Sequence, residues 1–112
     1  MALITFSEIL NDAAQRRYAI GSFNAWDLYS AKNIVSTAER LRSPVITSLW
    51  QPELDLAGES ELFDICLALG RSAAVPVAVF LDHAPELSDV ERAIQMGATC
   101  DRVGDYQGQH RQ

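Results

Sequence analysis

Positively charged residues are scarce in this sequence of 112 residues, which has 9 Lys and Arg against 15 Asp and Glu and a formal net charge of −6. Nucleic acids and anionic membrane surfaces are bound through clustered Lys and Arg, so we expect neither as a partner. Long apolar runs are absent too: none reaches the length of a membrane span, and the first residues lack the pattern of a signal peptide. We therefore expect a cytoplasmic protein.

The common motifs of nucleotide binding and hydrolysis are also missing. The sequence contains no Gly-x-Gly-x-x-Gly, P-loop, His-Glu-x-x-His or Gly-x-Ser-x-Gly pattern. Its two cysteines, Cys66 and Cys100, do not have the spacing of metal ligands or of a redox pair. Cys66 falls on the apolar stripe of an expected helix, which predicts a buried thiol. His110 lies among polar residues and is expected to be exposed to solvent.

What the sequence does contain is an alternation of apolar strands and amphipathic helices. Thr5 to Glu8 has the form of a capping box that begins a helix, and Asp27 is expected to begin the next one. Ser43-Pro44 ends that second helix, because the residue before a proline disfavours helical geometry. The remaining pattern predicts strands over 18–24, 45–50 and 76–81, a loop over 51–58, and a helix with its apolar stripe over 62–73. A last helix is expected to begin with a capping box over 88–91 and to turn Val90, Ala93 and Ile94 inward.

One helix followed by three strand–helix units predicts an α/β fold in which helices cover a parallel sheet. Strands connected in this way point in one direction, so their C-terminal ends share one edge of the sheet. Asn24, Trp50, Asp82 and His83 are expected at that edge. Ligand binding and chemistry occur there in folds of this kind.

Asp82-His83, at the end of the third strand, is the sharpest candidate for chemistry. A strand that ends in a loop can direct both side chains to one site, where a histidine suits a metal ion and an aspartate suits proton transfer. The alternative is a solvated loop start, in which Asp82 accepts hydrogen bonds from backbone N–H groups. Asn24 also has two interpretations: its amide can donate to a substrate oxygen, or its side chain can cap the following helix.

The other conspicuous side chains near this edge have structural interpretations. Trp26 and Trp50 are expected to pack rather than to stack on a ligand. Four acidic residues are interpreted as solvated helix starts, placed favourably for the helix dipole: Glu59, Glu61, Asp89 and Glu91.

Several segments together resemble the class II fructose-bisphosphate and tagatose-bisphosphate aldolases. In chain order they are YAIGSFN (18–24), SPVI (43–46), VPV (75–77) with LDH (81–83), and AIQMG (93–97). The likeness extends over about residues 3 to 99. It implies that the chain is the N-terminal portion, about three βα units, of a (β/α)8 TIM barrel that carries zinc at the C-terminal rim of its strands.

The resemblance also implies a reaction. Class II aldolases reversibly cleave a ketose 1,6-bisphosphate into dihydroxyacetone phosphate and an aldehyde, with Zn2+ as the Lewis acid that polarises the ketone. By this likeness Asp82 is the catalytic acid/base, His83 is one zinc ligand, and Asn24 binds substrate near the reacting carbons. A phosphorylated ketose and dihydroxyacetone phosphate are the implied ligands.

The sequence departs from that family in three respects. Catalytic zinc has three protein ligands, and the family takes its other two histidines from later strands that these 112 residues lack. Trp50 stands where the family has a small or hydroxyl residue. The polar segment over 99–112 lacks the apolar strand that follows the glycine at position 97 in the family. We therefore divide the chain into an aldolase-like part over 1–98 and an atypical tail over 99–112, and hypothesise that the chain is truncated by a change of reading frame near Thr99.

Three interpretations stay open at this point. The first is an aldolase by descent that is inactive alone, since a complete barrel has about 250 residues. The second is a non-catalytic interaction module, which forms a homo-oligomer or associates with a fuller aldolase through an exposed sheet edge. The third is a complete small domain of flavodoxin type, which the lack of a phosphate-binding loop after the first strand opposes. The sequence does not distinguish fructose from tagatose bisphosphate.

Overall fold

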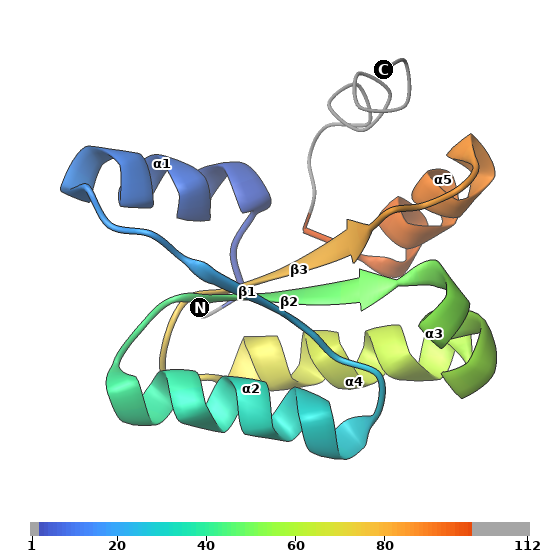
Figure 1. Cartoon of the computed structure of the whole chain (residues 1–112), viewed down its shortest axis with the longest axis horizontal. Helices are drawn as coiled ribbons and strands as arrows, with labels where there is room; N and C mark the ends of the chain where they lie inside the picture. Colours follow the sequence, from blue (N-terminus) through green and yellow to red (C-terminus); the bar gives the residue numbers. More distant parts are fainter. Residues whose placement is uncertain (1–2, 100–112) are drawn as a thin grey trace.

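A computed structural model describes residues 3–99 of the chain. Three parallel strands form one sheet in the order β1-β2-β3, which confirms the expected α/β arrangement; the predictions for the tail lie outside the described residues. Within the described residues, no helix is long and apolar enough to cross a membrane. The elements in chain order (Figure 1) are α1 (Phe6–Arg16), β1 (Gly21–Asn24), α2 (Leu28–Leu41), β2 (Val45–Trp50), α3 (Gln51–Ala57), α4 (Glu59–Ser72), β3 (Val77–Asp82) and α5 (Leu87–Met96).

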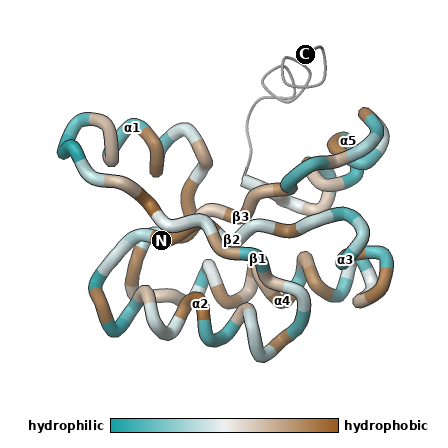
Figure 2. The backbone as a smooth tube through the Cα atoms, viewed as in Figure 1, coloured by the Kyte–Doolittle hydropathy of each residue, from teal (hydrophilic) through white to brown (hydrophobic). Residues whose placement is uncertain are grey.

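The main core lies between the sheet and the helices α2 and α4, which run side by side on one of its faces (Figure 1). Val79 and Leu81 of β3 are buried there together with Phe63, Cys66 and Leu67 of α4. Cys66 is buried, so the expectation of a buried thiol is confirmed, and burial raises the pKa of the thiol to about 12. Hydrophobic and hydrophilic residues alternate along these helices (Figure 2), as expected of helices with one buried side.

Helix α1 lies on the opposite face of the sheet (Figure 1). Its Ile9 is buried against Ile46 of β2 and Ala78 of β3. Phe6, at the start of the same helix, stacks on Phe80 of β3 with ring centroids 4.8 Å apart. This second, smaller core covers the face near the N-terminal ends of β2 and β3. Helix α1 leaves the C-terminal ends of these strands uncovered.

Two of the expected helix starts are confirmed, and both are set by side-chain caps. The Thr5 hydroxyl accepts a hydrogen bond from the Glu8 N–H, 3.0 Å away, at the start of α1. Asp27 Oδ1 accepts from the Ser30 N–H, 2.7 Å away, at the start of α2. Each cap satisfies an N–H that has no partner within its helix.

Other boundaries differ from the sequence-based expectation. The loop expected over 51–58 is wrong, because this segment forms the short helix α3 with Pro52 in its first turn. The capping box expected over 88–91 is displaced: the cap of α5 is Glu86. Ile94 was expected to point inward but is exposed. Strand β1 has four residues instead of the expected seven, and all four are exposed.

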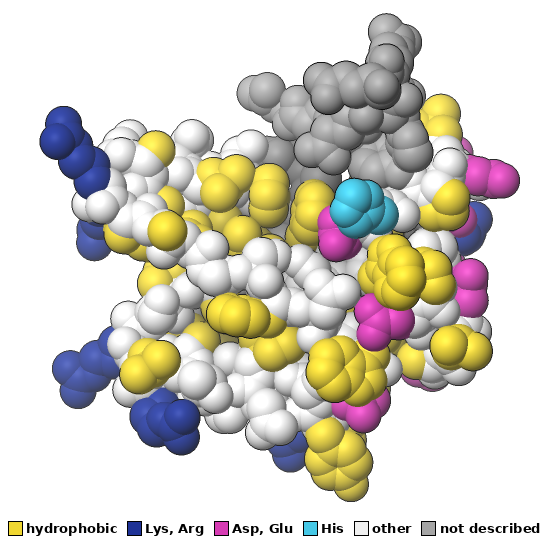
Figure 3. Space-filling view, in the orientation of Figure 1, with side chains coloured by type: hydrophobic (Ala, Val, Ile, Leu, Met, Phe, Trp, Pro, Cys, Tyr) yellow, Lys and Arg dark blue, Asp and Glu magenta, His cyan; other side chains and the backbone are white. Residues whose placement is uncertain are grey.

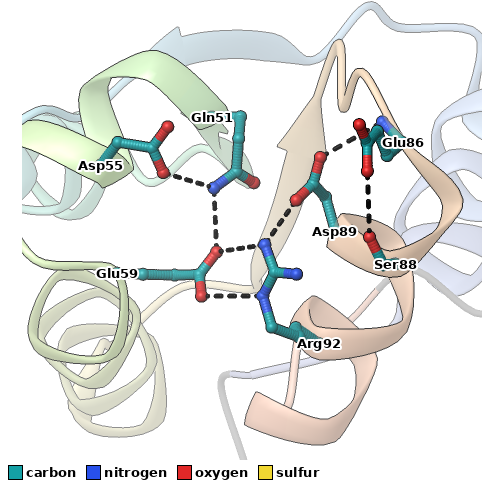
Figure 4. Close-up of polar contacts among 7 residues, drawn as sticks. All are labelled: Gln51, Asp55, Glu59, Glu86, Ser88, Asp89 and Arg92. Atoms are coloured by element: carbon teal, nitrogen blue, oxygen red, sulfur yellow. Dashed lines mark hydrogen bonds and ion pairs between the residues drawn. The ribbon is translucent and has the colours of Figure 1, made fainter.

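A polar network joins the segments that follow β2 and β3 (Figure 4). Gln51 Nε2 donates to Asp55 and to Glu59, each 2.9 Å away. Arg92 of α5 donates to Glu59, with 3.1 Å between Nε and Oε2, and also to Asp89. Glu59 and Asp89 lie in the first turns of α4 and α5, which confirms them as helix starts. The expectation that they are solvated is wrong for Asp89, which is buried, and Glu59 is paired with Arg92. The network ties α3 and α4 to α5.

The two edges of the sheet differ in how far the described residues cover them. Leu3 forms a parallel bridge with Val77 at the start of β3. Thr99 adds to the same edge, because its N–H donates to the Val79 carbonyl, 3.0 Å away, and its hydroxyl accepts from the Val79 N–H at 2.7 Å. Strand β1, at the other edge, pairs within residues 3–99 with β2 only.

Truncation of Ile9 tests the packing of α1. Ile9→Ala should lower the free energy of unfolding by about 2–5 kcal/mol in urea denaturation, because it removes a fully buried aliphatic side chain. Leu10→Ala is the matched control, since Leu10 is the next residue of the same helix and is exposed; it should cost less than about 1 kcal/mol. Equal losses for the two variants would contradict the placement of this helix.

The Glu59–Arg92 pair predicts a pH dependence of stability. Hydrogen bonding to Arg92 lowers the pKa of the Glu59 carboxyl, and this effect outweighs the raising effect of burial. Because the pKa is lower in the folded chain, the carboxylate stabilises the fold above its unfolded pKa of about 4.3, and this stabilisation is lost as the pH falls through the folded pKa. Urea unfolding between about pH 6 and about pH 3 should therefore show a smaller acid-induced loss in Glu59→Gln than in the wild type.

The control for that prediction is the same substitution in an Arg92→Met background. There Glu59→Gln should change the pH dependence much less, because the partner that lowers the pKa is gone. An effect of the same size in both backgrounds would show that Arg92 does not set the pKa of Glu59.

Candidate active site at the strand ends

The C-terminal ends of the three strands meet at one edge of the sheet, which we call the rim. Asn24 ends β1, Trp50 ends β2 and Asp82 ends β3. The register pairs Asn24 with Ser48 and Trp50 with Asp82. Because side chains alternate along a strand, all four residues of these two pairs lie on the same face of the sheet. Helix α1 packs on this face nearer the N-terminal ends of the strands. Neighbouring strands lie about 4.8 Å apart, and Asp82 lies two residues further along than Phe80, the residue level with Asn24, so Asn24 and Asp82 are roughly 12 Å from each other across β2.

Asp82 and His83 lie next to each other where β3 ends. His83 has a φ of 52°, in the left-handed region, so the chain turns sharply after Asp82. His83 Nε2 consequently lies 3.7 Å from Asp82 Oδ1. The side chain of His83 is 78% exposed and that of Asp82 is 34% exposed. The histidine lies right of the centre in Figure 3, beside acidic and large hydrophobic side chains. The structure thus brings these two titratable groups together at an accessible surface.

Asn24 contacts a residue that the sequence analysis missed. Its Nδ2 donates to Oε1 of Glu53, 3.3 Å away, and Glu53 lies in the first turn of α3. The interpretation of Asn24 as a helix cap is wrong, because Asp27 caps α2. The sequence Gln51-Pro52-Glu53 carries a signal that could have found Glu53, since a proline followed by an acidic residue is typical of a first helical turn.

A pair of serines lies on the same face as Asn24. The hydroxyls of Ser22 and Ser48 are 2.5 Å apart, one donating to the other, and Ser48 is buried. Ser48 pairs with Asn24 in the register of β1 and β2. The sequence analysis did not single out either serine, although their alternation with apolar neighbours places both on one face.

The two tryptophans near the rim are about half exposed, Trp26 by 53% and Trp50 by 42%. Trp50 pairs with Asp82 in the register of β2 and β3 and therefore stands beside the acid at the strand end. Trp26 follows the end of β1 and contributes to a shallow pocket with Phe23, Asn24 and Tyr29.

The described residues do not form a complete zinc site. Within residues 3–99, no group of three or more His, Cys, Asp or Glu side chains is arranged to hold a metal ion, whereas a catalytic zinc has three protein ligands. His83 offers an accessible imidazole with one carboxylate beside it. The described part of the chain thus contributes one histidine donor to such a site.

Comparison with known proteins identifies one family. Residues 4–101 match the family model for class-II fructose-bisphosphate aldolase. The fructose-bisphosphate aldolase of Thermus caldophilus is 36% identical over 97 residues, an alignment that covers 87% of this chain and 32% of that protein. The GatY subunit of the D-tagatose-1,6-bisphosphate aldolase of Klebsiella oxytoca is 33% identical over 97 residues, covering 87% of this chain and 34% of the subunit.

The comparison of folds also identifies an aldolase. The crystal structure of the YdjI aldolase from Escherichia coli K12 superposes with a TM-score of 0.80 at 26% identity, and the match covers 86% of this chain and 38% of that one. The chain therefore spans about a third of the length of these relatives. Its three strands and their helices correspond to the N-terminal part of an aldolase TIM barrel. The resemblance found in the sequence is confirmed, and the chain belongs to the class II fructose-bisphosphate aldolase family.

Proposed function

We propose that this chain supplies the first part of the active site of a class II ketose-bisphosphate aldolase. The reaction is the reversible aldol cleavage of fructose 1,6-bisphosphate or tagatose 1,6-bisphosphate into dihydroxyacetone phosphate and an aldehyde. The observation that carries the proposal is the placement of Asp82 and His83 together at the end of β3, with Asn24 on the same face of the sheet. The names of the two relatives support this choice of sugars.

Asp82 acts as the acid/base in this proposal. During cleavage its carboxylate accepts the proton of the substrate hydroxyl whose oxygen becomes the aldehyde oxygen. The carbon–carbon bond breaks at the same time, and its electron pair stays with the other fragment as an enediolate. That fragment becomes dihydroxyacetone phosphate when its carbon takes up a proton from solvent, and Asp82 releases its own proton to solvent. In the reverse reaction Asp82 returns the proton to the same oxygen. Its partial exposure at the rim leaves the carboxylate open to substrate.

Asn24 binds the substrate and is oriented by Glu53. An amide N–H can donate to an oxygen of the substrate that gains negative charge during the reaction. Glu53 accepts from the same Nδ2 group, so it favours one orientation of the amide plane and leaves the second N–H of that nitrogen for the ligand.

His83 supplies one ligand to the zinc ion that class II aldolases use in general. The remaining protein ligands are not among the described residues, and for this reason we assign no step to the metal. We further propose that the 112 residues alone do not catalyse the aldol reaction, because one histidine does not hold a catalytic zinc ion.

Assays of the isolated chain test the claim of inactivity. The purified protein should cleave neither fructose 1,6-bisphosphate nor tagatose 1,6-bisphosphate above the uncatalysed rate, with or without added zinc. In calorimetric titration zinc should bind weakly, and His83→Ala should remove that binding. His110→Ala is the matched control, since His110 is the second of the two histidines in the sequence, and it should leave zinc binding unchanged. Robust cleavage by the isolated chain, or zinc binding that does not depend on His83, would overturn these assignments.

A chimera tests the role of Asp82 in a complete barrel. Residues 4–99 of this chain would replace the aligned segment of the Thermus caldophilus aldolase. Asp82→Asn should then lower kcat by about 10²–10⁴-fold, the usual contribution of a positioned acid/base, and should leave the zinc content unchanged. His83→Ala should lower the zinc content of the purified chimera. An active chimera whose kcat does not respond to Asp82→Asn would exclude Asp82 as the acid/base.

A further inference from the structure

Glu53 is a half-buried acidic residue at the rim that the proton transfer by Asp82 does not use. It closely follows the end of β2 and lies in the first turn of α3. Its Oε1 accepts a hydrogen bond from Asn24 Nδ2, 3.3 Å away, so this contact joins the ends of β1 and β2. An acidic residue in a first helical turn is favoured by the helix dipole. The dipole accounts for the residue type, but it does not account for the contact with Asn24.

Glu53 has no positively charged partner among the residues that the structure describes. None of the ion pairs found within residues 3–99 includes it. Figure 3 shows basic side chains mainly on the left and acidic ones mainly on the right. Most of the described Lys and Arg residues lie at the C-terminal ends of helices, near where the strands begin: Arg16, Arg17, Arg40, Arg42 and Arg71. Over residues 3–99, no neighbouring Lys or Arg therefore neutralises the charge of Glu53.

Glu53 can accept further hydrogen bonds beside Asn24. A carboxylate has acceptor positions for about four hydrogen bonds, and in the described part of the chain the one found comes from Asn24. A ligand that binds the second N–H of Asn24 thus lies next to a carboxylate that can take more donors. A hydroxyl group of the ligand can donate to it, whereas a phosphate dianion only accepts and would be repelled.

The chemistry of the proposed substrates identifies this hydroxyl. In open-chain fructose or tagatose 1,6-bisphosphate, the carbons that carry a hydroxyl group are C3, C4 and C5. The C4 hydroxyl gives its proton to Asp82. The C3 hydroxyl is on the carbon that gains negative charge when the bond between C3 and C4 breaks, and a carboxylate beside that carbon would oppose the reaction. The C5 hydroxyl keeps its proton and stays with the aldehyde, on the carbon next to the carbonyl carbon.

The distance across the rim allows one short segment of sugar to reach both sides. Asn24 and Asp82 lie roughly 12 Å apart across β2. Their side chains extend into this span, and a hydrogen bond of about 2.8 Å from each then leaves room for a ligand oxygen between them. When the C4 oxygen takes that position, the C5 hydroxyl on the next carbon comes within reach of the carboxylate that Asn24 binds.

We propose that Glu53 determines which aldehydes this site accepts. Its carboxylate accepts a hydrogen bond from the hydroxyl on the carbon next to the aldehyde carbon, which is the C5 hydroxyl of the ketose. An aldehyde that lacks this hydroxyl leaves the carboxylate without its donor and reacts less efficiently. The inference rests on the proposed function, to which it adds a specificity residue for the aldehyde half of the substrate.

The test uses the chimera of residues 4–99 with the Thermus caldophilus aldolase, in the direction of aldol addition. Dihydroxyacetone phosphate is combined either with D-glyceraldehyde or with 3-hydroxypropanal, which differs only in lacking the hydroxyl next to the carbonyl carbon. The measured quantity is the ratio of kcat/KM for D-glyceraldehyde to that for 3-hydroxypropanal. Glu53→Ala should lower this ratio by roughly tenfold or more, the usual effect of losing a hydrogen bond to a charged group.

A second background separates this contact from the orientation of Asn24. If Glu53 acted only by orienting Asn24, Glu53→Ala would slow the reactions of both aldehydes by the same factor and would have no further effect in an Asn24→Ala chimera. The proposal instead requires the ratio to fall in both backgrounds, because the carboxylate itself contacts the substrate. Glu53→Gln keeps a neutral acceptor and should retain part of the preference.

Glu61→Ala serves as the control, because Glu61 is an exposed acidic residue in the first turn of the next helix, α4. It should leave the ratio unchanged. Circular dichroism and the zinc content show whether each variant is folded and loaded with metal. If the chimera does not fold, a smaller graft that places residues 50–57 of this chain in the Thermus caldophilus aldolase gives the same comparison with and without Glu53→Ala.

The specificity role and the acid/base role can fail separately. In a chimera whose kcat falls in Asp82→Asn, a ratio that Glu53→Ala leaves unchanged, or an equal loss with both aldehydes, would overturn the role of Glu53 alone. A ratio that falls in Glu53→Ala while kcat does not respond to Asp82→Asn would support the contact and exclude Asp82 as the acid/base. No activity from the chimera or the graft, when both are folded and contain zinc, would overturn both roles.

Discussion

The parallel pairing of β2 with both of its neighbours is the constraint on which the rest of the structure depends. Residues 45–49 of this strand are all buried, and hydrogen-bonded strands lie on both sides. Parallel strands can be joined only by crossovers, which here are α2 and the pair α3 and α4. The same direction of all three strands places Asn24, Trp50 and Asp82 at one rim. A slip of one residue in either pairing would move a rim side chain to the other face of the sheet.

The face of the sheet on which α1 packs is apolar near the start of the strands and polar near their C-terminal ends. Near the start of the strands Ile46 and Ala78 are apolar and are covered by Ile9 of α1. Two residues or more further along, the same face carries Ser48 and Asp82. Helix α1 thus closes the apolar end and leaves the polar end accessible. The position of the site follows as much from where this helix stops as from the strands.

The sequence predicted the elements that local pattern determines. The apolar runs located β2 and β3 to within a residue, and Thr5 and Asp27 were correctly identified as helix caps. The cap of α5 was not, because Ser88 to Glu91 has the residue types of a capping box, whereas Glu86, the observed cap, is not a residue type that N-caps favour. The choice between them depends on the extended backbone of Glu86, which the turn after β3 sets. Helix α3 was missed because seven residues are too few to show a clear helical period.

The side-chain contacts between distant segments were missed for a different reason. Glu53 is 29 residues from Asn24, and Arg92 is 33 residues from Glu59. Such pairs form only when the sheet has brought separate crossovers together, and no spacing within a single segment encodes them. Asp82 and His83 could be singled out because they are adjacent in the sequence at the end of an apolar run. Their approach to 3.7 Å depends on the left-handed backbone of His83, which a sequence pattern does not show for a residue other than glycine.

The open rim and the open edge of β1 are two consequences of one geometry. A sheet that closes on itself directs the side chains at its strand ends toward a common centre, and it also leaves no unpaired edge. Three strands supply only part of that ring, so Asp82 and His83 face a space that the described residues do not enclose, and within residues 3–99 strand β1 pairs on one side only. A polypeptide that pairs with β1 would extend the same ring and bring further strand ends toward His83.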